Sequence, residues 1–152
     1  RLKTARPEIA LGADFIAGFP TETEEHFAST LSIIEAAQLA YVHAFPYSPR
    51  PGTPAARMPQ NERHVIKARA ARLREAGEAA LRRHLDSWIG KEADALIERE
   101  GFGRLADFST VLLGPPTSRR QAPALAGEDA GGPSKRLRFT HHDGAHLIGV
   151  AA

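Results

Sequence analysis

Residues 9–18 read IALGADFIAG and residues 39–47 read LAYVHAFPY, and these two runs decide the fold. Each run is almost continuously apolar, which is typical of a strand that is covered on both faces of a parallel sheet. A helical stretch separates the two runs, so the order within about 40 residues is strand, helix, strand. That order predicts a βαβ unit with a right-handed crossover, and therefore an α/β fold.

The stretch between the two runs is predicted to be a helix from about residue 23 to residue 38. Phe27, Leu31 and Ile34 recur at helical spacing. The acidic segment 21–25 ahead of them suits the positive end of a helix dipole. Thr21, followed three residues later by Glu24, fits a capping box in which Thr21 is the N-cap residue.

A proline-rich segment, SPRPGTP at 48–54, follows the second run and can form neither a helix nor a central strand. We expect an ordered loop there, at the carboxyl end of the strand, where α/β proteins bind ligands. A second helix is predicted from about 61 to 88, with Gly77 as a mild break and Gly90 as its C-terminal cap. The basic residues of this helix, Arg69 among them, are assigned to its polar surface.

Beyond Gly90 the composition changes to short strand-like runs. Runs 93–100 and 108–113 are separated by a glycine-rich turn at 101–103, and runs 137–140 and 146–150 by a predicted two-residue turn at Asp143-Gly144. Segment 114–134 is rich in Pro, Gly and Ala, and we expect it to be a flexible insertion. Four or five short strands in about 60 residues predict a small β-barrel of the kind that binds oligonucleotides.

The composition excludes several classes of protein. Hydrophobic residues make up 42% and charged residues 25% of the 152 positions, unlike a disordered tail or a membrane protein. No stretch approaches the roughly 18–20 apolar residues of a spanning helix. Cysteine is absent, so the chain itself can hold no disulfide, thiolate zinc site or thiolate-bound iron–sulfur cluster.

The net charge of +2 is unevenly spread. Residues 1–49 carry three Lys or Arg against six Asp or Glu, whereas residues 50–85 carry nine against three. A basic stretch of that size can neutralise phosphates and make binding depend on salt. A solvated helix face would have the same composition, so charge alone leaves both interpretations open.

Two motifs make the chain recognisable: DFIAGFPTETEEHF at 14–27 and HAFPYSPRPGTPAARMPQ at 43–60. They resemble the fifth and sixth strand regions of the radical S-adenosylmethionine methylthiotransferases. Within that family the chain is most similar to the branch that acts on N6-threonylcarbamoyladenosine next to the tRNA anticodon. The isopentenyladenosine branch shares YSPRPGTPA but usually has Gly in place of Thr21, and it differs just before Tyr47.

The resemblance implies two domains. Residues 1–90 would be the C-terminal portion of a (β/α) radical S-adenosylmethionine partial barrel, and residues 91–152 a TRAM-like RNA-binding barrel. The parent enzyme would add a methylthio group to C2 of the modified adenosine in tRNA, using S-adenosylmethionine and two [4Fe-4S] clusters. Because the cluster cysteines would lie in a missing N-terminal part, this chain is expected to be inactive alone.

The partners implied are that N-terminal part of the same polypeptide and the tRNA anticodon loop, in the cytoplasm and without a membrane. A free-standing, non-catalytic RNA-binding module remains the alternative class of function. In either case the apolar side chains of Ile9, Leu11 and Phe15 are expected to be exposed where preceding strands would pack. Low solubility or self-association of the isolated chain would follow.

By resemblance, a group of residues at the ends of the two strands would lie near the adenosyl group of S-adenosylmethionine, and none would be catalytic. Gly18 would let a ligand approach the backbone closely, and Phe19-Pro20 would form an apolar wall for adenine. Without the resemblance, these are ordinary strand-end residues. The predicted contacts are Ile16, Gly18, Phe19, Glu22, Phe45, Pro46 and Tyr47.

Arg50 lies between prolines, which restrict its backbone and lower the entropic cost of placing its guanidinium. We predict that it positions either a tRNA phosphate or the carboxylate of the threonylcarbamoyl group. An intramolecular ion pair or helix cap is the alternative.

Basic residues also gather on the last strands. Lys135, Arg136 and Arg138, with Phe139 interleaved, fit the backbone neutralisation and base stacking by which proteins hold single-stranded RNA. Phe139 fits a core position better than a stacking position. A predicted hairpin turn separates two members of the nearby trio His141, His142 and His146, so we expect no metal site there.

His43 lies within the second run, where a buried, hydrogen-bonded structural histidine is expected and a place near the substrate is the alternative.

The central expectation concerns the strand ends. Segments 18–22 (GFPTE) and 45–52 (FPYSPRPG) should lie side by side as walls of one pocket.

Overall fold

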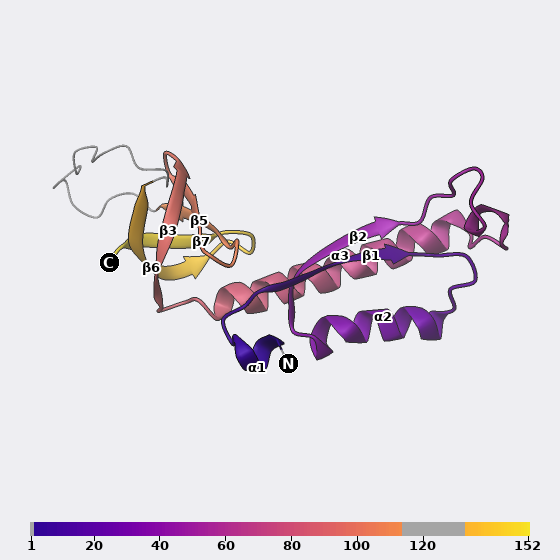
Figure 1. The fold of residues 1–152 in the computed structure, drawn as a ribbon, viewed down its shortest axis with the longest axis horizontal. Coiled ribbons are helices and arrows are strands. Elements are labelled where there is room, and N and C mark those ends of the chain that lie inside the picture. The colour runs from indigo at the N-terminus through magenta and orange to yellow at the C-terminus, as the bar shows by residue number, and fades with distance from the viewer. Residues whose placement is uncertain (1, 114–132) are drawn as a thin grey trace. The chain divides into compact units, whose positions relative to one another are not determined.

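The computed structural model describes residues 2–113 and 133–152 and divides into two compact units (Figure 1). One unit is Ala10–Arg83, and the other is His84–Ala152 together with the stretch up to Ile9. The insertion expected at 114–134 lies outside the described residues, apart from Pro133 and Ser134.

The first unit contains the predicted βαβ arrangement. Strand β1 (Leu11–Ala17), helix α2 (Glu24–Ala36) and strand β2 (Leu39–Pro46) follow one another, and the two strands pair in parallel. A short 3-10 helix, η1 (Ala55–Arg57), then leads to helix α3 (Arg63–Asp86), which continues into the second unit. The strand–helix–strand prediction is therefore confirmed.

Helices α2 and α3 pack against one face of the two-stranded sheet, along which they lie in Figure 1. Phe27 from α2, Leu73 from α3 and Ala17 from β1 are fully buried in their shared core. Leu11 and Phe15 pack against this same core, because side chains two apart on a strand share a face. The prediction that they would be exposed is wrong.

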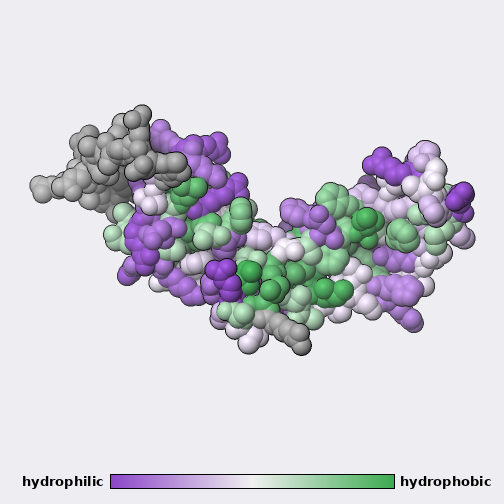
Figure 2. Space-filling view, viewed as in Figure 1, coloured by the Kyte–Doolittle hydropathy of each residue, from purple (hydrophilic) through white to green (hydrophobic). Residues whose placement is uncertain are grey.

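The other face of the sheet has no cover from the described part of the chain. Ile16 on β1 is 57% exposed and Phe45 on β2 is 51% exposed. The composition of the strands indicates burial on both faces, yet only one face is buried in the structure. The space-filling view shows hydrophobic residues gathered over the region of β1 and β2 (Figure 2).

Helix α2 begins two residues later than the Thr21 capping box predicts. Thr21 has a φ of 67° and lies in a turn closed by Glu22 N donating to Phe19 O at 2.9 Å. The N-cap is Thr23, whose Oγ1 accepts from His26 N at 3.2 Å. Thr21 is part of the turn after β1, so Thr23 caps the helix instead.

Gly77 does not break α3. A Cβ placed there would lie 2.8 Å from Val42 Cβ, so the glycine allows the helix to pack closely on β2. Gly90 is not the cap either, since the helix ends at Asp86 and a turn follows. The Gly90 N–H instead donates to Phe139 O at 2.8 Å.

The second unit begins with the four-residue helix α1 (Leu2–Ala5), and its main part is a closed five-stranded barrel, as predicted. Around the barrel the strand order is β3-β4-β5-β7-β6. Of the predicted glycine-rich turn at 101–103, Gly101 lies in a turn between β3 and β4, whereas Phe102 and Gly103 belong to a strand. The strands are β3 (Glu92–Arg99), β4 (Phe102–Arg104), β5 (Thr110–Leu113), β6 (Ser134–His142) and β7 (Leu147–Ala151).

Phe139 is fully buried in the barrel core with Val111 and Leu147, which confirms the core interpretation of this residue.

The connection between β6 and β7 has four residues, not the predicted two. Asp143 Oδ1 accepts from the backbone N–H groups of Ala145 and His146 at 2.8 and 2.7 Å. These bonds lower the pKa of Asp143 to about 2.

Among the described helices, none combines the length and apolar character that a membrane crossing requires.

Candidate functional site

The carboxyl ends of β1 and β2 lie side by side, as the central expectation requires. Ile16 pairs with Phe45, and Ala17 pairs with Pro46. Beyond the strands, Tyr47 N donates to Ala17 O at 2.8 Å. The rings of Phe19 and Tyr47 then meet edge to face, with centroids 5.4 Å apart. Segments 18–22 and 45–52 therefore meet side by side at Phe19 and Tyr47.

Three cross-strand pairs lie on the exposed face of the sheet. Ile16 and Phe45 form the apolar pair nearest the carboxyl ends. Asp14 is opposite His43 two residues earlier on each strand, and Gly12 is opposite Tyr41 two residues before that. His43 is exposed on this face, so the expectation of a buried histidine is wrong. The face thus presents an apolar surface beside an aspartate and a histidine on neighbouring strands.

Gly18 does not leave its backbone open to a ligand on every side. A Cβ on this residue, whose φ is +78°, would lie 2.6 Å from Ile66 Cγ1 and 3.0 Å from Ile66 Cα. Helix α3 therefore packs directly on the turn after β1. Asn61, just before that helix, donates from Nδ2 to Phe19 O at 2.7 Å and fixes the turn further.

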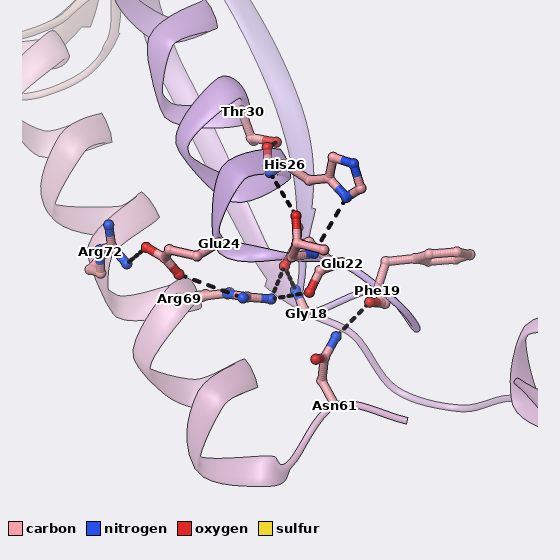
Figure 3. A network of polar contacts seen from close by, with 10 residues as sticks. Gly18, Phe19, Glu22, Glu24, His26, Thr30, Asn61, Arg69 and Arg72 are labelled. Atoms are coloured by element: carbon pink, nitrogen blue, oxygen red, sulfur yellow. Dashed lines mark hydrogen bonds and ion pairs between the residues drawn. The ribbon is translucent and has the colours of Figure 1, made fainter. Parts of the chain in front are cut away.

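Glu22 holds the turn from the inside (Figure 3). Its Oε2 accepts from Gly18 N at 2.9 Å and from Arg69 Nη1 at 2.8 Å. Arg69 Nη1 also donates to the Glu22 carbonyl at 2.9 Å. The side chains of Glu22 and Arg69 are only 10% and 8% exposed, so this is a buried ion pair. The carboxylate of Glu22 therefore points into the protein, where it fixes the turn after β1.

Arg69 is buried, so its assignment to the polar surface of the helix is wrong. Its guanidinium lies 5.6 Å from the centre of the Phe27 ring. Its Nε has no hydrogen-bond partner among the described residues. Arg72 lies over the same ring at 4.7 Å and pairs with exposed Glu24. The hydrogen bond from Arg72 holds the pKa of Glu24 below its usual range.

A hollow of about 540 Å³ lies between the end of β2 and the other side of α3. Pro46 at the end of β2 and Tyr47 just after it line this hollow, whereas Phe45 does not. The hollow is lined by residues of 46–49 and 60–74 and by none of 18–22, so it is not the expected pocket with both segments as walls. The Tyr47 hydroxyl is buried and has no partner among the described residues. No acidic residue lines the hollow. Its basic residues are Arg63, Lys67 and Arg74.

Arg50 is exposed in the loop after β2. Its carbonyl accepts from Thr53 N at 3.2 Å and from Thr53 Oγ1 at 2.8 Å, which closes a turn. Its guanidinium makes no ion pair with any other described side chain, so the structure gives no support to the intramolecular alternative.

Two of the three basic residues predicted on the barrel have acidic partners on the neighbouring strand. Arg138 Nη2 lies 2.8 Å from Glu92 Oε1, and Arg136 Nη1 lies 3.5 Å from Asp94 Oδ2. Both pairs are directly opposite in the register of β3 and β6. Surface pairs of this kind are weak, so a phosphate can compete for the arginines. Lys135 has no such partner in the described part of the chain.

The three histidines of the barrel have separate neighbours. His142 Nε2 lies 2.9 Å from Asp86 Oδ1, and His146 Nδ1 lies 3.0 Å from Asp143 Oδ2. His141 Nδ1 lies 3.0 Å from Thr140 Oγ1. Within residues 2–113 and 133–152, no three His, Asp or Glu side chains are grouped as metal ligands.

A buried polar cluster holds the loop between β4 and β5. Asp107 Oδ2 accepts from Trp88 Nε1 at 2.9 Å and lies 2.9 Å from His84 Nε2. Asp107 Oδ1 accepts from Ser109 N at 2.9 Å. Because His84 Nε2 also contacts Ser109 Oγ, one ring nitrogen serves both neighbours. A catalytic Ser-His-Asp triad uses both ring nitrogens, so this cluster is structural.

The stability that Asp107 contributes should be lost in acid. Burial raises the pKa of Asp107, but hydrogen bonds from His84, Ser109 and Trp88 outweigh it and keep the pKa below the usual value. The stabilisation is therefore complete above the unfolded pKa of about 3.9 and disappears as the pH falls through the lower folded pKa. Thermal unfolding between pH 7 and 3 should show wild type losing stability below pH 4 more steeply than Asp107→Asn. Parallel curves would contradict this role.

No family model matches the chain. Curated relatives do match, and they are tRNA methylthiotransferases. The chain is 40% identical over 121 residues to the tRNA-2-methylthio-N(6)-dimethylallyladenosine synthase of Thermobifida fusca, which is 79% of this chain and 24% of that protein. It is 36% identical over 146 residues to the synthase of the same name from Zymomonas mobilis, 91% of this chain and 33% of that protein. The chain is thus homologous to the tRNA methylthiotransferases, and the resemblance seen in its motifs is confirmed.

The threonylcarbamoyladenosine tRNA methylthiotransferase MtaB of Rickettsia prowazekii is 46% identical to the chain over 113 residues. That alignment covers 74% of this chain and 27% of the relative. The chain therefore spans about a quarter to a third of the length of these relatives.

Proposed function

We propose that this chain is the C-terminal part of a radical S-adenosylmethionine enzyme that adds a methylthio group to C2 of N6-threonylcarbamoyladenosine beside the tRNA anticodon. The 46% identity to a relative of that name supports this branch. The parallel pairing that joins segments 18–22 and 45–52 into one edge is the observation that carries the proposal. Relatives named for dimethylallyladenosine make the isopentenyladenosine branch the second candidate.

The uncovered face of the sheet supports a missing part of the same barrel. Its strands have the composition of strands buried on both sides, yet Ile16 and Phe45 are more than half exposed. The limited share of each relative that the chain covers fits the same interpretation. We assign residues 1–90 to the partial barrel and 91–152 to a TRAM-like module of this cytoplasmic enzyme.

The residues at the strand ends fit an adenosyl group. Ile16, Phe19 and Phe45 are exposed apolar side chains beside one edge, as a flat adenine requires. Gly18 and Glu22 set the turn that positions Phe19, and the backbone at Pro46 and Tyr47 continues the edge. These residues bind and orient the ligand and keep water from it.

The two [4Fe-4S] clusters do not fit the residues present, because the chain contains no cysteine. Cleavage of S-adenosylmethionine and supply of sulfur therefore belong to the missing part, and this chain alone is expected to be inactive. The chain contributes binding surfaces for S-adenosylmethionine and tRNA, with Arg50 aimed at a tRNA phosphate or the threonylcarbamoyl carboxylate.

Helix α3 supports an RNA-binding role for the hollow. Its arginines divide between two faces. Arg69 and Arg72 are paired with acidic residues near the turn. Arg63, Lys67 and Arg74 recur at helical spacing on the face toward the hollow and have no acidic partner among the described residues. Unpaired cations on one surface attract a phosphate backbone.

Removing two of these charges should weaken tRNA binding by the full-length enzyme. In Lys67→Gln/Arg74→Gln, the slope of log affinity against log salt should fall by about 1.4, since each phosphate contact to a single strand contributes about 0.7. Arg82→Gln/Arg83→Gln is the matched control, with the same charge change on the same helix. Equal losses in the two variants would contradict a specific contact at the hollow.

Mass spectrometry of tRNA nucleosides tests the function itself. A strain lacking the gene should lose the methylthio group on N6-threonylcarbamoyladenosine, and the full-length gene should restore it. Loss on isopentenyladenosine instead would move the enzyme to the second branch. If neither nucleoside changed, the non-catalytic RNA-binding module would be the function left, and a reading frame starting just before Arg1 would support it.

A further inference from the structure

Phe108 is the most exposed of the large hydrophobic residues in the described part of the chain, at 72%. It lies in the loop between β4 and β5, and its neighbours turn the other way. Leu105 is 5% exposed and Ser109 is 1% exposed. The loop thus buries its other anchoring side chains and directs a single aromatic ring into solvent.

The backbone at Phe108 is in a conformation that disfavours this residue type. Its φ is 68°, in the left-handed region, where Gly and Asn are far better tolerated than a bulky side chain. An exposed ring adds little to the core in return. The fold alone therefore gives no reason for phenylalanine at this position, and a functional reason is needed.

The loop is held rigidly in this conformation. Leu105 N donates to Ser109 O at 2.9 Å, and Phe108 N donates to Leu105 O at 3.0 Å. Asp107 ties the loop to the end of α3 through His84 and Trp88, as described above. Phe108 therefore lies between the buried residues Leu105 and Ser109. Because the loop is already ordered, Phe108 loses little further conformational freedom when a ligand binds.

We propose that Phe108, on the β4–β5 loop of the barrel, is a stacking platform for an unpaired nucleobase of the tRNA. A rigid, exposed ring is suited to stack on a base, and small closed β-barrels bind oligonucleotides with such rings beside basic residues. Lys135 and Arg136 provide basic residues on the same barrel. The inference deepens the proposed function, since it rests on tRNA being the partner.

The test uses the full-length enzyme and three variants. Phe108→Asn removes the ring and suits the left-handed backbone, Phe108→Tyr keeps the ring, and Leu96→Thr removes another exposed apolar side chain of the barrel, 45% exposed. Affinity for unmodified tRNA and the thermal midpoint are measured for each, together with affinity for S-adenosylmethionine.

We expect Phe108→Asn to weaken tRNA binding by about tenfold while its thermal midpoint stays equal or rises. Phe108→Tyr and Leu96→Thr should keep wild-type affinity, and binding of S-adenosylmethionine should not change. The proposal is overturned if Phe108→Asn binds tRNA like wild type, if it lowers the midpoint, or if Leu96→Thr loses as much affinity. Failure of the wild-type enzyme to bind tRNA would contradict the proposed function instead.

Discussion

Replacing Arg69 with methionine is expected to destabilise the chain by about 3–5 kcal/mol, because it leaves the carboxylate of Glu22 buried without its partner. Glu22 and Arg69 are each about one-tenth exposed and are joined at 2.8 Å. Methionine retains an apolar stem against Phe27, so the loss should come from the charge rather than from packing. Denaturant unfolding of the 152-residue chain measures the difference.

A double replacement separates the ion pair from the position itself. In Glu22→Gln/Arg69→Met neither buried charge remains, and the glutamine oxygen can still accept from Gly18 N, so most of the stability should return. Arg72→Met is the control on the same helix and should have little effect, because Arg72 and Glu24 are largely exposed. Equal effects of Arg69→Met and Arg72→Met would contradict the account of the turn.

Gly18→Ala is expected to cost about 2–4 kcal/mol, from the left-handed backbone and from overpacking against α3. The added Cβ would lie 2.6 Å from Ile66 Cγ1 and 3.0 Å from Ile66 Cα. The second contact is with the backbone of α3, so a smaller side chain at position 66 would not relieve it. The turn after β1 would therefore have to move away from the helix. Thermal unfolding of the chain measures the loss.

Gly52→Ala isolates the backbone part of that cost. Gly52 has a φ of +86°, close to the value at Gly18, but a Cβ there meets nothing within 4 Å. Its replacement should therefore cost only about 1–2 kcal/mol. If the two alanine variants were equally stable, the contact between Gly18 and Ile66 would not hold the edge together.

The order of elements could be predicted from sequence because local patterns determine it. The apolar runs at 9–18 and 39–47 gave the two strands, and short runs separated by glycine gave the barrel. The details that failed depend on residues far apart in the chain. Thr21 resembles an N-cap by spacing, but Thr23 caps the helix instead, because Thr21 lies in the turn after β1. Asn61 and Arg69, more than 40 positions away, donate hydrogen bonds to that turn.

The site was predictable only in part, for the same reason. Its two segments follow from parallel pairing, which a βαβ order implies. Arg69 resembles its surface neighbours in sequence, and its partner Glu22 lies 47 positions away. Phe108 stands at the start of a strand-like run in the sequence, whereas in the structure its loop is held by the contacts of Asp107 with His84 and Trp88, far earlier in the chain. No local signal marks either residue.

The affinity of the full-length enzyme for S-adenosylmethionine tests the central claim most directly. Equilibrium dialysis would compare wild type with Ile16→Ala/Phe45→Ala, and with Ile33→Ala as a control, since Ile33 is 48% exposed on α2. The account predicts at least about a tenfold loss for the double variant, from lost apolar contact, and none for the control. Unchanged affinity in the double variant would contradict the claim that the paired ends of β1 and β2 bind the adenosyl group.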